Sequence, residues 1–328
     1  MEYKKKTYAL ILAGYDKLDR ATRKSSKKEI REAYGEDIYL GENKFLYKLA
    51  GKPVIQWVID AVFNAKRNGK PIYERICVYN DVDTFCRAID LSKYPNLEIR
   101  QMTDSLAGHM KDFYRTMEQG DRADVFYGDT PRITSADVEY IYDEFSSVLG
   151  HEKDMRGCTV HNIYSIVDFE DMTDNWFPDR VRYIKRGKNK GKLKSYVGFD
   201  TFQARIGNAG SIEKLPCNDK LVEHELLNFL YNLRKALTPR IFSKIMYYLW
   251  KTKKFRLINQ IKNRCIIADE FYLTAIDILE RLHKIDLSDY GGQLFHIKKN
   301  AAHWENDIDG PNDLATIERR FKELNYEG

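Results

Sequence analysis

Glycine and aspartate residues follow apolar runs in this chain, at positions where they could bind a ligand. The first run, residues 7–13, leads directly into Gly14, and Asp129 lies just after a second run at residues 123–127. Ligands of open α/β sheets bind just beyond the carboxyl ends of the strands. We therefore expect Gly14 and Asp129 to face one pocket.

A further pair of carboxylates precedes the last segment with helical spacing. Asp307 and Asp309 are two positions apart, which places them on one side of an extended chain. With Asp129 they could bind a hard cation, because such cations prefer oxygen ligands. The alternative is structural. Asp307 and Asp309 could cap the following helix, and Asp129, which precedes Thr-Pro, could be a turn or capping residue.

The elements that must position these residues alternate between strand and helix. The run at 7–13 is short and continuously apolar, as in a strand that is buried on both faces of a parallel sheet. Further strands are predicted at 75–79, 97–101 and 123–127, and helices at 53–64, 83–91, 110–119 and 135–148. This alternation predicts a doubly wound α/β domain.

The second half of the chain has a different pattern. Residues 221–282 have an almost wholly helical spacing of apolar residues, and a final helix is predicted at 311–324. No internal repeat or low-complexity linker separates the two halves. We interpret the chain as one domain, residues 1–328, with a basic helical insertion at residues 220–285.

The order of four motifs resembles the MobA-like nucleotidyltransferases. The motifs are a strand ending in LAG, K-x-L-x-x-x-x-GKPV, GDTP-x-x-T and DID-x-P-x-DL-x-x-x-E, and the match spans residues 8–321. The resemblance implies a three-layer, Rossmann-like sandwich of the GT-A type, from a branch with a basic helical insertion. It also implies Mg²⁺-dependent transfer of a nucleoside monophosphate from an NTP to a phosphorylated small-molecule acceptor, with release of pyrophosphate.

The same resemblance implies roles for individual residues. Lys44 and Asp129 would be catalytic, and Asp129 and Asp309 would bind Mg²⁺, because the transition state needs positive charge near the phosphoryl oxygens. Gly207 and Asn208 would bind the acceptor substrate. The residues expected to bind the nucleotide are Ala13, Gly14, Arg20, Arg23, Lys44, Ser105 and Asp129.

The first motif departs from the family pattern. A second glycine is missing after Gly14, and Arg20 or Arg23 could supply positive charge in its place. Lys44 could be an ordinary surface lysine, and Ser105 could simply cap a helix. Two alternatives stay open: a GT-A glycosyltransferase that uses a nucleotide sugar, and a nucleotide-binding protein that has lost catalysis and associates with an anionic membrane.

Charge is distributed unevenly along the chain. The net charge is +5, but residues 226–268 contain ten Lys or Arg and no Asp or Glu, which leaves −5 on the remainder. Three interpretations fit: a helix packed on the body, a helix that contacts an anionic membrane through residues 234–264, or capture of a polyanionic substrate or RNA. Contact with an anionic membrane is kept as an expected partner, and nucleic acid is not.

The sequence also predicts a location. No segment approaches the roughly 20 apolar residues that span a bilayer, and the charged N-terminus lacks the apolar segment of a secretory signal. The five cysteines are widely spaced, without the pattern of a zinc site. We therefore predict a cytoplasmic protein, with peripheral membrane association as the alternative.

Overall fold

The computed structural model describes most of the first half of the chain and several segments of the second. These are residues 5–15, 42–103, 105–149, 159–166, 209–213, 292–299, 307–308 and 310–323. The remaining described residues are Ser243, Met246, Tyr247, Trp250, Lys251, Lys253 and Phe255.

Contacts divide the chain into two compact units. Unit 1 comprises Met1–Leu149, Ala209–Lys214 and His303–Gly328, and unit 2 comprises Gly150–Asn208 and Leu215–Ala302. All four sequence motifs belong to unit 1. The predicted insertion at 220–285 belongs to unit 2, and few of its residues are described. The insertion and the single-domain interpretation therefore stay predictions.

The strands of unit 1 form a mainly parallel sheet in the order β10-β8-β1-β6-β7. β1 pairs in parallel with both β8 and β6, β6 pairs in parallel with β7, and β10 is antiparallel to β8. In this register Leu12 lies opposite both Tyr127 and Tyr79, so three strands end at the same edge. The bounds are β1 (Thr7–Leu12), β6 (Arg75–Asn80), β7 (Leu97–Gln101), β8 (Arg122–Tyr127) and β10 (Ala209–Glu213).

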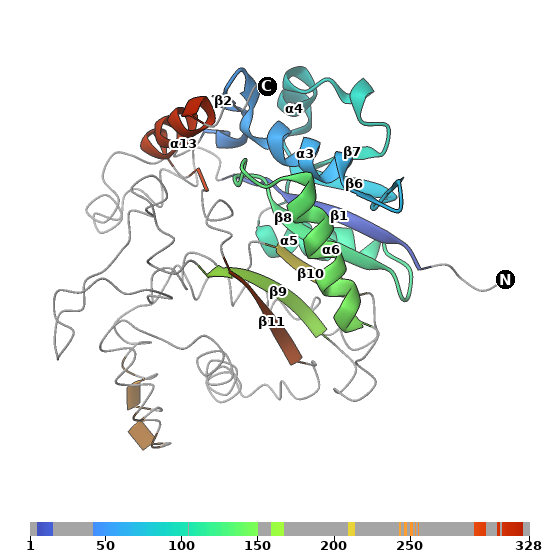
Figure 1. The fold of residues 1–328 in the computed structure, drawn as a ribbon, viewed down its shortest axis with the longest axis vertical. Coiled ribbons are helices and arrows are strands. Elements are labelled where there is room, and N and C mark those ends of the chain that lie inside the picture. Colours follow the sequence, from blue (N-terminus) through green and yellow to red (C-terminus); the bar gives the residue numbers. More distant parts are fainter. Residues whose placement is uncertain are drawn as a thin grey trace. The chain divides into compact units, whose positions relative to one another are not determined.

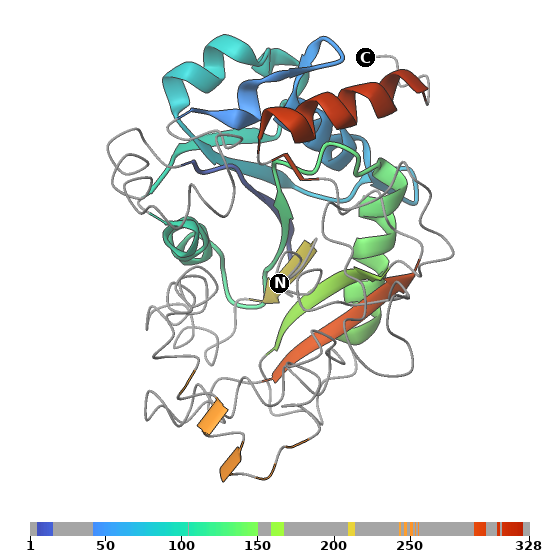
Figure 2. The ribbon, with the colours of Figure 1, turned by 90° about the vertical axis from the view of Figure 1, so that its left-hand side faces the viewer.

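Helices cover both faces of this sheet and confirm the predicted α/β sandwich (Figures 1 and 2). Helix α3 (Val54–Asn64) contacts α6 (Ser135–Leu149), and α5 (Leu106–Arg115) lies on the opposite face, against β1. Helix α4 (Val82–Ala88) contacts β7. The prediction for α5, residues 110–119, was displaced, because Ser105 caps the helix and starts it at Leu106.

The core of unit 1 explains the apolar runs. In β1, Ala9, Leu10 and Ile11 are buried, as expected for a strand covered on both faces. Helix α3 follows Pro53, whose missing N–H costs nothing at a helix start. Its buried residues are Val54, Ile55, Trp57, Val58, Ile59, Ala61 and Val62.

Short elements connect the sheet to α3. The 3₁₀ helix η1 (Lys44–Leu46) leads into the hairpin of β2 (Lys48–Leu49) and β3 (Lys52–Pro53). Gly51 has a φ of +86°, a conformation that only glycine adopts without strain. A second small hairpin, β4 (Lys66–Arg67) with β5 (Lys70–Pro71), lies exposed beyond α3, and η2 (Leu91–Lys93) follows α4.

The last helix, α13 (Pro311–Glu323), packs on the β2–β3–α3 segment. Phe321 lies edge-to-face against Trp57, with ring centroids 4.7 Å apart, and the Trp57 indole donates a hydrogen bond to the Leu49 carbonyl at 3.1 Å. The buried members of this cluster are Leu49, Val54, Trp57, Ile308, Ile317 and Phe321. The cluster fixes the chain that enters α13, which includes the fourth motif.

Unit 2 is described in less detail. Its strands β9 (Thr159–Ile166) and β11 (Gly292–Lys299) pair in parallel over their whole length. Among the described helices of the chain, none is long and apolar enough to cross a lipid bilayer.

Candidate functional site

Three of the four motifs meet at Gly128, at the carboxyl edge of the sheet. The Gly128 N–H donates to the Leu12 carbonyl at 3.0 Å. A Cβ atom at Gly128 would lie 3.1 Å from Cβ of Ala13 and 3.2 Å from side-chain carbons of Ile55 and Phe45. These distances are shorter than ordinary carbon contacts. The close approach therefore explains why position 128 is a glycine.

An ion pair lies beside this junction. The Lys44 ammonium is 2.7 Å from Oδ2 of Asp129, and the two side chains are only 16% and 18% exposed. Lys44 begins η1, while Asp129 follows β8, 85 residues later. Two residues that the sequence assigned to one site are thus in direct contact. Lys52, the other lysine of this motif, instead pairs with Asp60 and lies over the Trp57 ring.

The fourth motif reaches the same aspartate. The Ile308 N–H donates to the Asp129 carbonyl at 3.0 Å, and the Ile308 side chain is fully buried. Asp307, the residue before it, is partly buried. The apolar cluster around Phe321 and Trp57 therefore holds one carboxylate-bearing segment against another. Asp129 lies in a turn, as the structural alternative predicted. In the adjoining backbone the Thr130 carbonyl accepts from the Ile133 N–H, and the Thr130 hydroxyl donates to the Tyr127 carbonyl.

Asn80 joins the first two motifs, and the sequence analysis missed it. Its side chain is fully buried at the end of β6 and donates to the Ala13 carbonyl at 2.8 Å. Its oxygen accepts from Asn43 at 2.6 Å and from the Asp81 N–H at 2.8 Å. Asn43 precedes Lys44, so Asn80 links the end of β1 to the start of η1. The available signal was a polar residue that ends an apolar strand.

Gly14 lies against the side chain of His109, a residue of α5 that was not predicted to belong to the site. A Cβ atom at Gly14 would lie 2.3 Å from Cε1 of His109, which excludes any side chain there unless the ring moves. The His109 ring stacks on Tyr79, with centroids 4.8 Å apart and 15° between the planes. Both ring nitrogens are buried, and neither makes a hydrogen bond of good geometry in the described part of the chain, although the Thr103 backbone is close enough to oppose part of the pKa shift. Burial lowers the pKa of His109 to about 4, so the ring is neutral near pH 7.

Ser105 caps α5, as the structural alternative proposed. Its hydroxyl accepts from the Gly108 N–H at 3.0 Å, and its carbonyl accepts from the Thr103 hydroxyl at 3.0 Å. A Cβ atom at Gly108 would lie 2.3 Å from that Thr103 oxygen. The cap therefore sets the N-terminal end of α5, near the carboxyl edge of β1. A role of Ser105 in binding a nucleotide stays a prediction.

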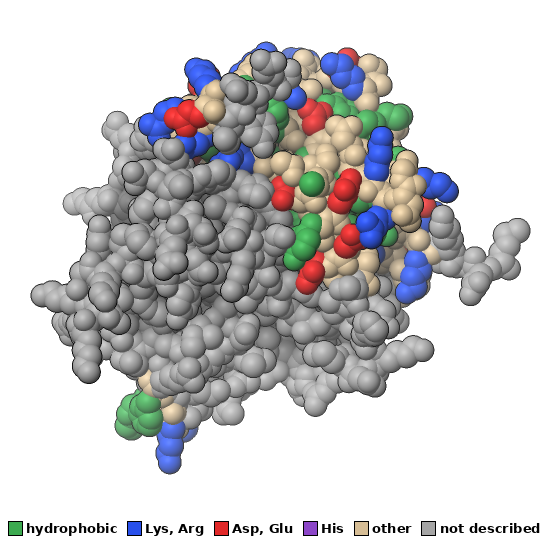
Figure 3. All heavy atoms as spheres, viewed as in Figure 1, with side chains coloured by type: hydrophobic (Ala, Val, Ile, Leu, Met, Phe, Trp, Pro, Cys, Tyr) green, Lys and Arg blue, Asp and Glu red, His purple; other side chains and the backbone are tan. Residues whose placement is uncertain are grey.

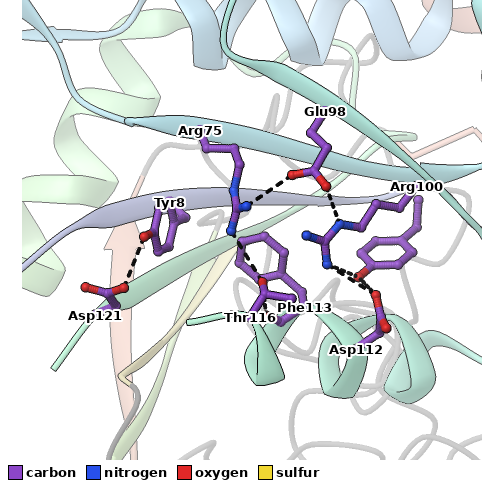
Figure 4. A network of polar contacts seen from close by, with 9 residues as sticks. Tyr8, Arg75, Glu98, Arg100, Asp112, Phe113, Thr116 and Asp121 are labelled. Carbon is purple, nitrogen blue, oxygen red and sulfur yellow. Dashed lines mark hydrogen bonds and ion pairs between the residues drawn. The ribbon is translucent and has the colours of Figure 1, made fainter. Parts of the chain in front are cut away.

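A polar network fixes α5 to the sheet (Figure 4). Arg75 and Arg100 share Glu98, at 3.2 and 2.7 Å, and Arg100 reaches Asp112 on α5 at 3.3 Å. Asp112 also accepts a hydrogen bond from Tyr79, the ring on which His109 stacks. Burial and the hydrogen bond to Asp112 raise the pKa of Tyr79 above its ordinary value. The network thereby supports the His109 position against Gly14.

Several predicted site residues lie outside the described part of the chain. They are Arg20, Arg23, Gly207, Asn208 and Asp309. Within the described residues, no group of three or more His, Cys, Asp or Glu side chains gathers in a metal-binding arrangement. The described site therefore consists of Ala13, Gly14, Lys44, Asp129 and the segment around Asp307.

Comparisons with known proteins identify the fold. No family model and no curated protein matches the sequence. A solved structure of a hypothetical transferase from Thermus thermophilus matches with a TM-score of 0.52 and 17% identity, over 94% of this chain and 99% of that one. This likeness shows that the two chains share an α/β fold.

Two further solved structures match less closely. CMP:2-keto-3-deoxy-manno-octonic acid synthetase in complex with CTP has a TM-score of 0.47 and 11% identity, over 97% of this chain and 99% of that one. 4-Diphosphocytidyl-2C-methyl-D-erythritol synthase from Anaerococcus prevotii has a TM-score of 0.43 and 9% identity, over 97% and 96% of the two chains.

Proposed function

We propose that this protein is a MobA-like, Mg²⁺-dependent nucleotidyltransferase. It would transfer a nucleoside monophosphate from an NTP to a phosphorylated small-molecule acceptor and release pyrophosphate. The observation that best supports this proposal is the contact of Lys44 with Asp129, beside the backbone bond between Ile308 and Asp129. Residues from three distant segments are thereby gathered at the carboxyl edge of a parallel sheet, the usual ligand site of such folds.

The two carboxylates proposed as ligands, Asp129 and Asp309, would suit Mg²⁺. Magnesium is commonly held by one or two carboxylates together with phosphate oxygens. Asp129 would supply one carboxylate, and Asp309 is proposed as the second ligand. The segment that contains Asp307 is joined to Asp129 by the backbone hydrogen bond from Ile308. A bound Mg²⁺ would polarise the phosphoryl oxygens of the NTP.

Lys44 has a defined task in this scheme. Its ammonium is already at the site and is now neutralised by Asp129. If Asp129 held a bound cation, the Lys44 charge would be available to the α-phosphate. An acceptor phosphate oxygen then forms a bond to the α-phosphorus, and the bond to pyrophosphate breaks. Negative charge spreads over the phosphoryl oxygens in this step, so a fixed lysine stabilises the transition state more than the ground state.

The remaining roles follow the same proposal. Ala13 and Gly14 would lie beside the phosphates, and Arg20 and Arg23 would add positive charge. Ser105 would lie near the nucleoside, and the acceptor would bind near the pair Gly207 and Asn208.

Thermal unfolding with each of the four NTPs, with and without Mg²⁺, tests the proposal. A ligand at 100 times its Kd stabilises the folded protein by about 2.7 kcal/mol. We expect one or more NTPs to stabilise the wild type only when Mg²⁺ is present. Asp129→Asn should abolish that effect. Asp143→Asn is the matched control, because Asp143 is an exposed carboxylate on α6 that pairs with Arg67. Failure of all NTPs to stabilise the wild type would overturn the proposal.

A further inference from the structure

Unit 2 exposes a group of aromatic side chains next to lysines. Tyr247, Trp250 and Phe255 are 61%, 63% and 56% exposed, and they are the large hydrophobic residues that lie exposed in the described part of the chain. Lys251 and Lys253 between them are also exposed. We call these five residues the aromatic–lysine patch. Figure 3 shows the described atoms of this segment as hydrophobic and basic side chains side by side.

The patch differs from an ordinary packed helix. If this segment were an amphipathic helix buried against its own unit, Trp250 would lie on the buried face, because its spacing with Met246 places both among the apolar residues. Met246 is partly buried, but Trp250 is exposed. Isolated exposed apolar residues are common, whereas a contiguous cluster marks a binding surface. The exposed rings therefore need a partner.

Tyr247 and Trp250 are neighbouring rings just before a turn. Tyr247 and Trp250 have centroids 6.4 Å apart with 32° between their planes. The Lys253 N–H donates to the Trp250 carbonyl at 3.1 Å, and Lys253 has a φ of +57°. A non-glycine residue in this conformation is uncommon and interrupts a helix. The turn at Lys253 thus follows the helical residues Trp250 and Lys251.

Charge identifies the kind of partner. Residues 226–268 contain ten basic residues and no acidic one, so the segment around the patch cannot neutralise itself. Such a segment is attracted to an anionic surface. A soluble polyanion without bases or other apolar groups would be bound by the lysines alone and would leave the three aromatic rings uncovered. Tyrosine and tryptophan rings, in contrast, prefer the boundary between lipid headgroups and acyl chains, next to basic residues.

We propose that the aromatic–lysine patch binds the surface of an anionic lipid bilayer, with its rings at the headgroup level and its lysines against the lipid phosphates. This surface lies in unit 2 and does not depend on the proposed nucleotide chemistry of unit 1. The protein would then associate peripherally with a membrane whose surface is negatively charged.

Co-sedimentation with lipid vesicles tests this proposal on the full chain. Vesicles of phosphatidylcholine with phosphatidylserine should bind the wild type, and vesicles of phosphatidylcholine alone should bind it far less. Binding should weaken steeply between about 50 and 300 mM salt, because the screening length shrinks toward roughly 6 Å. Equal, salt-insensitive recovery with both vesicle types would overturn the proposal.

Matched variants locate the surface. Lys251→Gln with Lys253→Gln should lower the affinity for anionic vesicles by roughly 25-fold, at about fivefold per charge. Tyr247→Ser with Trp250→Ser should lower it by at least about tenfold. The control is Lys66→Gln with Lys70→Gln, which removes two exposed lysines from the β4–β5 hairpin and should change little. An equal loss of affinity in the patch and control variants would show that binding depends only on net charge, and it would overturn the assignment.

A spectroscopic readout separates lipid from nucleic acid. Insertion of Trp250 into the headgroup region should shift the tryptophan emission to shorter wavelength when anionic vesicles are added, and Trp250→Phe should remove that shift. Single-stranded RNA serves as the competing polyanion in the same titration. Binding of RNA without binding to either vesicle type would overturn the lipid proposal and assign the basic segment to nucleic acid.

Discussion

At the residue scale, the contact of His109 with Gly14 gives a structural reason for the glycine of the first motif. The sequence marked Gly14 as a phosphate-binding glycine, but the ring of His109 occupies the place of a side chain at that position. The glycine is therefore required by packing, whatever it does for a ligand. A buried imidazole whose nitrogens lack well-formed hydrogen bonds is also costly, on the order of 1–3 kcal/mol for each unsatisfied group.

The pKa of His109 predicts a pH dependence of stability. Burial lowers this pKa to about 4, whereas an unfolded histidine has a pKa of about 6.5. The unfolded chain therefore binds a proton more readily, and the free energy of unfolding falls as the pH drops from about 6.5 to about 4. The loss is on the order of 3 kcal/mol. His109→Leu should flatten this part of the profile in urea unfolding, and an unchanged slope would contradict the assignment.

Lys44 should act on the transition state. In a pyrophosphate-release assay with a panel of phosphorylated acceptors, Lys44→Met should lower kcat by about two orders of magnitude, with a smaller change in KM. Lys48→Met is the control, since Lys48 is an exposed lysine of the same motif. A change in KM alone would give Lys44 a role in ground-state binding.

The described part of the site was only partly predictable from the sequence. The common location of Lys44, Asp129 and the 307–308 segment follows from their places at strand ends and in the motif order. Their direct pairing does not, because both residues were expected to contact the nucleotide or its metal ion rather than each other. Asn80 and His109 were missed, since a single polar residue in an apolar run has no spacing signal.

At the element scale, helix α13 positions the fourth motif through its apolar contacts with β2 and α3. Phe321 is fully buried against Trp57. Phe321→Ala should lower the free energy of unfolding by roughly 3–5 kcal/mol, as for other buried phenylalanines. Phe255→Ala, at an exposed phenylalanine, should change it by less than about 0.5 kcal/mol. Chemical unfolding of both variants measures the difference, and equal effects would show that α13 does not stabilise unit 1.

Strands and long helices of unit 1 were predicted well because their apolar period is strong. The strand at 97–101 was predicted with its observed bounds, and α6 differs from the prediction by one residue. The position of α5 was predicted less well, because its start is set by the Ser105 cap rather than by apolar spacing. The antiparallel β10 was not predicted, because its five residues, Ala209–Glu213, contain no apolar run.

At the scale of the whole molecule, the division into two units predicts two unfolding transitions. Each unit has its own internal contacts, and chains of this kind often depart from two-state behaviour. Calorimetry should resolve a transition that Mg²⁺ with the preferred NTP raises and a second one that it leaves unchanged. Phe321→Ala should lower only the first. A single cooperative transition that responds to both changes would contradict the division.

The packing around Gly128 predicts how substitutions at this site affect one another. Because Ala13, Phe45 and Ile55 all approach the same missing side chain, a substitution at any of the four positions alters the room available to the other three. Mutational effects there should be strongly non-additive, and a harmful change at position 128 should be rescued by a smaller residue at position 45 or 55 rather than by changes at Lys44 or Asp129. In a scan of double substitutions, the effects at positions 13, 45, 55 and 128 should therefore depend on one another.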